Sequence, residues 1–121
     1  MLVTLVSIVL LAAAPTGTAA AGAGDGAPGR VQLIIFYGEG CPYCARELAF
    51  LRELQERQPL LDVDSYEVWN NAENRQLFET TAAAFGVDAR AVPTTFLGDT
   101  VWVGFDSTVQ QQIDDAVTTL A

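Results

Sequence analysis

Apolar and polar positions after residue 30 alternate in patterns that predict a mixed α/β domain. An apolar, β-branched run over Val31–Tyr37 ends at a glycine, as is typical of a strand buried on both faces of a sheet. Leucines at helical spacing from Pro42 to about Gln58 then predict an amphipathic helix. Pro59 ends that helix because it cannot continue one. Alternating residues over Ser65–Trp69 predict the second strand.

The second half of the domain predicts a helix, a hairpin and a last helix. A capping pattern at Asn70 precedes an apolar stripe at helical spacing. Gly98-Asp99 separates apolar runs over 94–97 and 100–105, which predicts two antiparallel strands joined by a tight turn. A capping box starting at Ser107 precedes the last apolar stripe. The predicted order is β-α-β-α-β-β-α, with no internal repeat.

The N-terminal segment has the pattern of a targeting signal. The apolar run Leu2–Ala14 is shorter than the roughly twenty residues of a spanning helix, and small residues near Ala21 suit cleavage. We therefore expect a signal peptide over 1–21, a flexible Gly/Ala linker over 22–30 and one domain over 31–121. The run lacks a basic start, so an uncleaved membrane anchor is the alternative. Both interpretations place the domain outside the cytoplasm, either periplasmic or secreted.

Charge and residue types exclude several classes of function. The 121 residues carry a net charge of −9, with fifteen acidic side chains against six basic ones, which disfavours nucleic acid as a partner. The absence of His excludes His-dependent bases and triads. Two Cys alone cannot complete a four-ligand zinc site. We therefore expect no metal and no organic cofactor.

The two cysteines lie in Cys41-Pro42-Tyr43-Cys44, where the first strand gives way to the first helix. A helix N-terminus offers free N–H groups and the positive end of the helix dipole, which stabilise a thiolate. Cys41 is therefore predicted to be an exposed nucleophile, and Cys44, one turn later, to resolve the mixed disulfide. Pro42 suits the first helical position because it has no N–H to leave unpaired.

The element order, the Cys41–Cys44 motif and Val92-Pro93-Thr94 together resemble the thioredoxin superfamily, specifically its glutaredoxin-like branch, over about residues 31–121. The resemblance implies a thioredoxin-like fold with a central, mixed, four-stranded sheet flanked by helices. It also implies that Pro93 is cis beside the active-site sulfurs. The catalytic residues would be Cys41 and Cys44, and the substrate-binding residues would be Pro42, Tyr43, Val92, Pro93 and Thr94.

The chain departs from its two best-known relatives. Gly104 and Asp106 match the segment with which glutaredoxins hold glutathione, but Glu39 stands near the motif where basic residues are usual. Thioredoxins carry a buried acid six residues before the first Cys, and this chain has Ile35 there. The segment after Tyr66 loosely resembles exported domains found beside membrane proteins that pass electrons. A membrane electron-transfer partner is therefore one expectation.

The leading hypothesis is a protein-disulfide oxidoreductase that exchanges disulfides with protein substrates as a monomer. One alternative is a module that binds extended peptides at Val92-Pro93 without turnover. Another is a glutathione-dependent glutaredoxin or an iron–sulfur carrier that uses Cys41. The motif leaves the direction, reductase or oxidase, open. Trp69 and Trp102 are expected to pack in the core, because aromatic residues in strands usually do.

Overall fold

The computed structural model describes residues 29–121 and begins with a β-α-β unit. Strand β1 (Val31–Tyr37) leads into helix α1 (Pro42–Arg57), which returns the chain to strand β2 (Leu61–Glu67). The expected signal segment, 1–21, and residues 22–28 of the expected linker lie outside the described residues.

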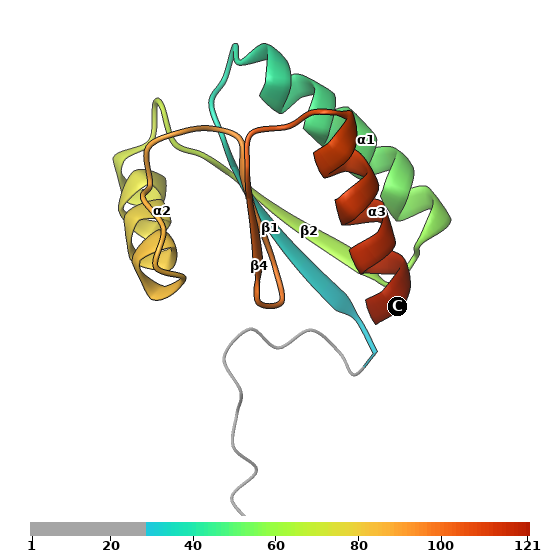
Figure 1. The fold of residues 1–121 in the computed structure, drawn as a ribbon. Helices are drawn as coiled ribbons and strands as arrows, with labels where there is room; N and C mark the ends of the chain where they lie inside the picture. The colour runs from blue at the N-terminus through green and yellow to red at the C-terminus, as the bar shows by residue number, and fades with distance from the viewer. Residues whose placement is uncertain (1–28) are drawn as a thin grey trace, which may run out of the picture.

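The second half supplies one helix, a hairpin and a last helix. Helix α2 spans Ala72–Ala84, strands β3 (Thr94–Leu97) and β4 (Thr100–Val103) form the hairpin, and helix α3 spans Ser107–Leu120. The strand order is β2-β1-β3-β4, with β1 parallel to β2 and antiparallel to β3. The predicted element order and the thioredoxin-like fold class are confirmed. Figure 1 shows α1 and α3 together on one face of the sheet and α2 on the other.

Alternation along the strands divides the core into two layers. Leu33 and Ile35 of β1 face α1 and α3, where they pack with Leu51, Leu54 and Ile113. Phe36, the next residue along, faces α2 in an aromatic cluster. Its ring lies 4.6 Å from that of Phe78 and 5.7 Å from that of Phe96, centroid to centroid. Because β1 is buried on both faces, its sequence is a nearly continuous apolar run, and that run was enough to predict the strand.

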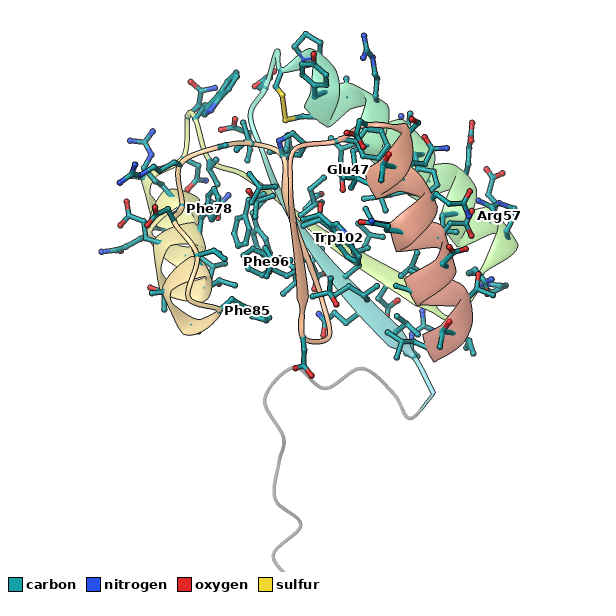
Figure 2. All side chains as sticks on the ribbon, viewed as in Figure 1. Glu47, Arg57, Phe78, Phe85, Phe96 and Trp102 are labelled. Carbon is teal, nitrogen blue, oxygen red and sulfur yellow. A yellow bond between two sulfur atoms is a disulfide. The ribbon has the colours of Figure 1, made fainter. Side chains whose placement is uncertain are left out.

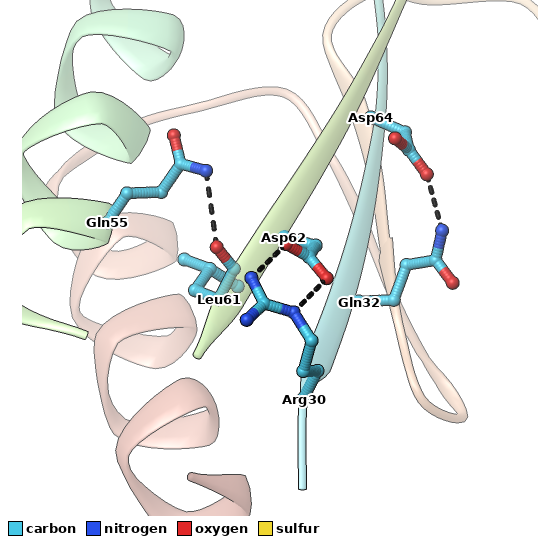
Figure 3. A network of polar contacts seen from close by, with 6 residues as sticks. All are labelled: Arg30, Gln32, Gln55, Leu61, Asp62 and Asp64. Atoms are coloured by element: carbon cyan, nitrogen blue, oxygen red, sulfur yellow. Dashed lines mark hydrogen bonds and ion pairs between the residues drawn. The ribbon is translucent and has the colours of Figure 1, made fainter. Parts of the chain in front are cut away.

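Strand β2 begins four residues earlier than predicted. It is an edge strand, and its N-terminal half alternates Leu61 and Val63, which pack in the core, with Asp62 and Asp64; the prediction missed this alternation. Parallel pairing with β1 extends it, because Asp62 lies opposite Gln32 and Asp64 opposite Ile34. Side chains connect the two strands as well: Arg30 forms an ion pair with Asp62 and Gln32 donates to Asp64 (Figure 3). The Arg30 hydrogen bond holds the pKa of Asp62 below its usual value.

The starts of two helices also differ from the predictions by one residue. Asn71, not Asn70, caps α2 and accepts from the N–H of Asn74 at 2.9 Å. Asp106, not Ser107, caps α3 through the N–H of Val109 at 2.8 Å. The neighbouring residue in each case offers a similar side chain, so only the backbone geometry decides which one caps.

The two tryptophans have different environments. Trp102 is buried, as predicted, and its indole N–H donates to Gln112 at 3.0 Å. Trp69 is 50% exposed and follows β2 rather than forming part of it, so the core assignment is wrong for this residue. Within residues 29–121, no helix has both the length and the apolar character needed to span a bilayer.

Candidate active site

The cysteine pair lies where three chain segments meet at one end of the sheet. Tyr37, the last residue of β1, pairs with Glu67, the last residue of β2, and its carbonyl accepts from Val68 N at 2.9 Å. The neighbouring residue Phe36 pairs with Thr94, the first residue of β3. The turn after β1, the turn after β2 and the loop before β3 therefore share one edge. Figure 2 shows the yellow disulfide at the N-terminal end of α1 on this edge.

Cys41 and Cys44 form a disulfide with their Cα atoms 5.2 Å apart. Cys41 is the N-cap of α1, and its Sγ accepts from the N–H of Cys44 at 3.2 Å. The same N–H would stabilise a thiolate at Cys41 in the reduced protein. Cys41 is 7% exposed and Cys44 1%. The prediction that Cys41 is exposed is therefore wrong for the disulfide form: as the capping residue, Cys41 lies against the first turn of its own helix and is buried.

Val92-Pro93 is a cis peptide bond, as the family resemblance implied. The hydroxyl of Thr94 donates to Ala91 O at 2.7 Å, and Pro93 O accepts from Gly104 N at 2.7 Å. Both bonds hold the loop that presents Val92. The side chains of Pro93 and Thr94 are buried, whereas Val92 is partly exposed. Of the three, only Val92 therefore offers side-chain surface to a ligand, and Thr94 positions the loop.

The two residues between the cysteines are exposed. Pro42 occupies the first turn of α1, and the ring of Tyr43 is 55% exposed. The guanidinium carbon of Arg46 lies 5.3 Å from the centre of that ring, which is a cation–π contact. The structure thus places Tyr43 and Val92, two of the predicted binding residues, on the surface at the same end of the sheet as the cysteines.

Sequence reasoning missed Glu47, a buried acid one turn after Cys44. Its side chain is fully buried between α1 and the sheet (Figure 2). Thr95 of β3 donates to one carboxyl oxygen, and the other, Oε2, has no hydrogen-bond partner within residues 29–121. Burial raises the pKa of Glu47 to about 7, although the Thr95 hydrogen bond acts in the opposite direction. The sequence signal for a buried acid was the position of Glu47, three residues after Cys44 on the apolar face of the helix.

A second missed residue, Glu67, lies at the end of β2. Its carboxylate accepts from the backbone N–H groups of Glu39 at 2.8 Å, Trp69 at 3.2 Å and Asn70 at 2.6 Å. Desolvation acts to raise the pKa of Glu67, but these three hydrogen bonds and the charge of Arg75 outweigh it and lower the pKa. Glu39 belongs to the turn that carries Cys41. The Glu67 carboxylate therefore connects the β1–α1 turn, which contains Glu39, to the β2–α2 turn.

Groups that could bind a cofactor or metal are sparse in the described part of the chain. No cluster of three or more Asp, Glu or Cys side chains there could hold a metal ion. The carboxylate of Asp106, which matched a glutathione-binding position, accepts from Val109 N at the start of α3. A hollow of about 530 Å³ lies between the β3–β4 turn and α3 but contains no cysteine.

Comparison with known proteins identifies the family. The glutaredoxin family profile matches residues 33–102, more than half of the chain. The chain belongs to the glutaredoxin family. This is a thioredoxin-fold family of thiol–disulfide oxidoreductases with a Cys-x-x-Cys pair, and its members act on thiol and disulfide substrates. A search of curated protein sequences found no match.

Solved structures agree with this fold. A proposed thiol:disulfide interchange protein DsbE from Chlorobium tepidum is 15% identical with a TM-score of 0.58, over 76% of this chain and 80% of that chain. Methanoredoxin from Methanosarcina acetivorans is 23% identical with a TM-score of 0.53, over 73% and 85%. A glutaredoxin from Archaeoglobus fulgidus is 18% identical with a TM-score of 0.52, over 79% and 98%. At these identities the three structures support the fold alone.

Proposed function

We propose that this chain is a protein-disulfide oxidoreductase that exchanges disulfides through Cys41 and Cys44 outside the cytoplasm. The observation that carries the proposal is the arrangement of the two sulfurs. Cys41 caps α1 and accepts the N–H of Cys44, and Cys44 lies one turn further inside. This arrangement favours one nucleophile and one resolving thiol rather than two equivalent groups.

In the reductive direction, the Cys41 thiolate attacks one sulfur of a substrate disulfide. A bond forms between Cys41 and that sulfur, and the other substrate sulfur leaves as a thiolate that takes a proton from water. The backbone N–H of Cys44 and the N-terminus of α1 stabilise the attacking thiolate. Neither the N–H nor the C=O of Val92 has a hydrogen-bond partner within residues 29–121, so both are free to pair with an extended substrate.

Resolution of the mixed disulfide requires a thiolate at Cys44, whose side chain is only 1% exposed in the disulfide form, so a nearby protein base would assist its deprotonation. Glu47 lies one turn away on the same helix face, and its carboxylate is the base that takes this proton. The Cys44 thiolate then attacks Cys41, and the substrate leaves as its second thiolate. Two electrons have passed from the dithiol to the substrate, and Cys41–Cys44 is oxidised.

A trapping experiment tests the exchange. Cys44→Ser leaves the attacking thiol but removes the resolving one, so a disulfide-bonded complex with a substrate protein is expected to accumulate. Cys41→Ser is the matched control and captures nothing. If the reduced wild-type protein neither reduces nor oxidises a model disulfide, and Cys44→Ser traps no partner, the proposal is wrong.

The role of Glu47 has a kinetic test. In Glu47→Gln, we expect release of the second substrate thiol to slow by about 100-fold, because an amide cannot accept the proton. The first thiol is released as fast as in the wild type. Since the pKa of Glu47 is about 7, the wild-type rate of the second step rises through pH 7. An equal loss in both steps would argue against this role.

The proposed location outside the cytoplasm and the proposed membrane electron-transfer partner rest on the sequence. Residues 1–21 would direct export, 22–30 would tether the domain, and a membrane protein would return electrons to the oxidised pair. Fractionation of cells that express the full chain, with mass spectrometry of its N-terminus, tests export and cleavage. Recovery of the intact chain from the cytoplasm would contradict it. A single species of monomer mass in light scattering is the expected oligomeric state.

Glutathione use is the second candidate, because the family match favours it. The test is the rate at which oxidised protein is reduced by glutathione compared with a dithiol. A saturable dependence on glutathione would support this candidate. A rate that rises only linearly, as for an unbound thiol, would leave protein substrates as the favoured class.

A further inference from the structure

A small pocket opens at the end of the sheet that carries the cysteine pair, and the exchange mechanism does not use it. It encloses about 160 Å³ between α2 and the two loops that flank the site. Val68 and Phe78, at 4% and 3% exposure, contribute apolar surface from the buried core, and Trp69 and Val92 line the pocket from the loops. Val92 also carries the unpaired backbone groups, so the pocket adjoins the segment on which an extended substrate would lie.

Trp69 is held in place by the turn that precedes Cys41. A Cβ atom on Gly38 would lie 2.2 to 2.5 Å from three atoms of the indole, so the ring packs directly on the glycine. Gly38 O in turn accepts from Cys41 N at 3.1 Å. The indole therefore covers the turn that presents Cys41, yet half of its surface stays in water. No other side chain fits at position 38 without displacing this ring.

The backbone of Trp69 is fixed at both ends. Its N–H donates to Glu67 at 3.2 Å, and its carbonyl accepts from Arg75 at 3.0 Å. Arg75 also donates to Val68 O at 3.2 Å. An exposed aromatic side chain on such a fixed backbone loses little conformational freedom when it binds a partner, which favours its use in recognition.

The rim of the pocket carries charges of both signs. Arg75 and Arg90 lie on it, but Glu79 lies there too, and Arg90 is 3.7 Å from Asp88. The rim is therefore close to neutral and gives no strong preference for an anion. The apolar floor and the indole favour an apolar occupant, and a cavity of roughly 150 Å³ is large enough for a benzene ring.

We propose that this pocket is a specificity site that receives one aliphatic or aromatic side chain of the substrate protein. That side chain belongs to a residue adjacent to the substrate's own reacting cysteine. An extended chain paired with Val92 would point alternate side chains toward the same face, which would bring one of them to the pocket. Trp69 is then the specificity-determining residue, and Glu67 positions it. This inference rests on the proposed disulfide exchange.

The test uses short peptides whose single cysteine is bonded to nitrothiobenzoate, a coloured leaving group. Leu, Phe, Ala or Asp is placed beside that cysteine, on the N-terminal side in one series and on the C-terminal side in another. With reduced wild-type protein, the Leu and Phe peptides of at least one series are expected to react roughly 10-fold faster than the Ala peptide. Equal rates in both series, or a fastest Asp peptide, would overturn the pocket assignment.

Variants assign the selectivity to the tryptophan. In Trp69→Ala, the ratio of Leu to Ala rates is expected to fall close to one, and Trp69→Phe retains part of it. Leu77→Ala is the matched control, because Leu77 is also exposed on this side of the sheet but does not line the pocket. If Trp69→Ala and Trp69→Phe both keep the full ratio, Trp69 is not the determinant and the proposal fails.

A small symmetrical disulfide, dithiobis-nitrobenzoate, distinguishes failure of the pocket assignment from failure of the proposed disulfide exchange. If the wild type reduces it but shows no preference among peptides, the pocket assignment is wrong and disulfide exchange stands. If the wild type reduces neither that compound nor any peptide, disulfide exchange itself is wrong and the pocket assignment falls with it.

Discussion

Two glutamates near the cysteine pair have opposite environments. Glu47 lies between α1 and β3, and Glu67 lies at the β2–α2 turn. Among residues 29–121, Glu47 has a single donor, the hydroxyl of Thr95, and burial raises the pKa of Glu47 to about 7. Glu67 accepts three backbone N–H groups, and these bonds, with the charge of Arg75, lower its pKa although desolvation acts against them. The two acids belong to the same site, but the fold stabilises the neutral form of one and the charged form of the other.

The number of donors decides which task each acid can perform. A carboxyl group whose pKa lies near neutrality can accept and return a proton within one catalytic cycle. A carboxylate that is held charged by three N–H groups cannot do so readily, but it orders the backbone around it. Glu47 is therefore suited to proton transfer at Cys44. Glu67 is suited to fixing the turns that carry Cys41 and Trp69.

The largest expected effect is on the pH dependence of stability in Glu47→Gln. The folded-state pKa of Glu47, about 7, lies above its unfolded value, so the folded protein binds the proton more tightly. Stability from this group is present below pH 4.5 and is lost as the pH rises to 7, by about 3 kcal/mol. Urea unfolding of the oxidised wild type at pH 5 and pH 8 should show this loss, and Glu47→Gln should not.

The matched control is Glu53→Gln, because Glu53 lies on the exposed side of the same helix. It should leave the wild-type pH dependence intact. A wild-type free energy of unfolding that stays constant between these two pH values would remove the contrast between Glu47 and Glu67.

A smaller effect is expected from Thr95→Val, which removes the one donor to Glu47. Both carboxyl oxygens then lack a partner, so the pKa of Glu47 rises further and the free energy of unfolding falls by about 1 kcal/mol. The midpoint of the pH-dependent stability loss moves to higher pH. Thr95→Ser keeps the hydroxyl and should behave as the wild type; a shift of the midpoint to lower pH in Thr95→Val would contradict the arrangement.

The smallest effect on stability is expected from Glu67→Gln, where the change is local. An amide offers one acceptor oxygen in place of two, and its NH₂ group faces backbone donors, so the β2–α2 turn loosens. Acrylamide quenching should report more exposure of Trp69, since Trp102 is buried and contributes little. Because the pKa of Glu67 is lowered, the stabilisation it provides in the wild type is lost as the pH falls through that pKa.

Glu73→Gln, on the first turn of α2, is the control for this measurement and should leave quenching unchanged. Quenching of Trp69 that is the same in Glu67→Gln and the wild type would show that the indole is held by Gly38 alone.

Long apolar patterns predicted their elements correctly, whereas the short pattern at the start of β2 and the environment of Trp69 were missed. The strand over Val31–Tyr37 is buried on both faces, so its apolar run is nearly continuous. Strand β2 lies at an edge, and its first half alternates Leu61 and Val63 with two acids that bond Arg30 and Gln32, a short strand pattern that the prediction from Ser65 onward did not use. Aromatic residues near strands usually pack in the core, which predicts a core position for Trp69, but its ring packs on Gly38 and is half exposed.

The sequence by itself determined the parts of the site that depend on neighbours along the chain. Only two residues, Pro42 and Tyr43, separate Cys41 from Cys44, and Pro42 begins the helix, so the first turn of α1 brings the two sulfurs together. Only the tertiary structure decided how the two acids behave. Glu47 meets Thr95 across 48 positions and Glu67 meets Glu39 across 28. The pKa of a carboxyl group depends on the donors and the water around it, and those are set by strand pairing rather than by local periodicity.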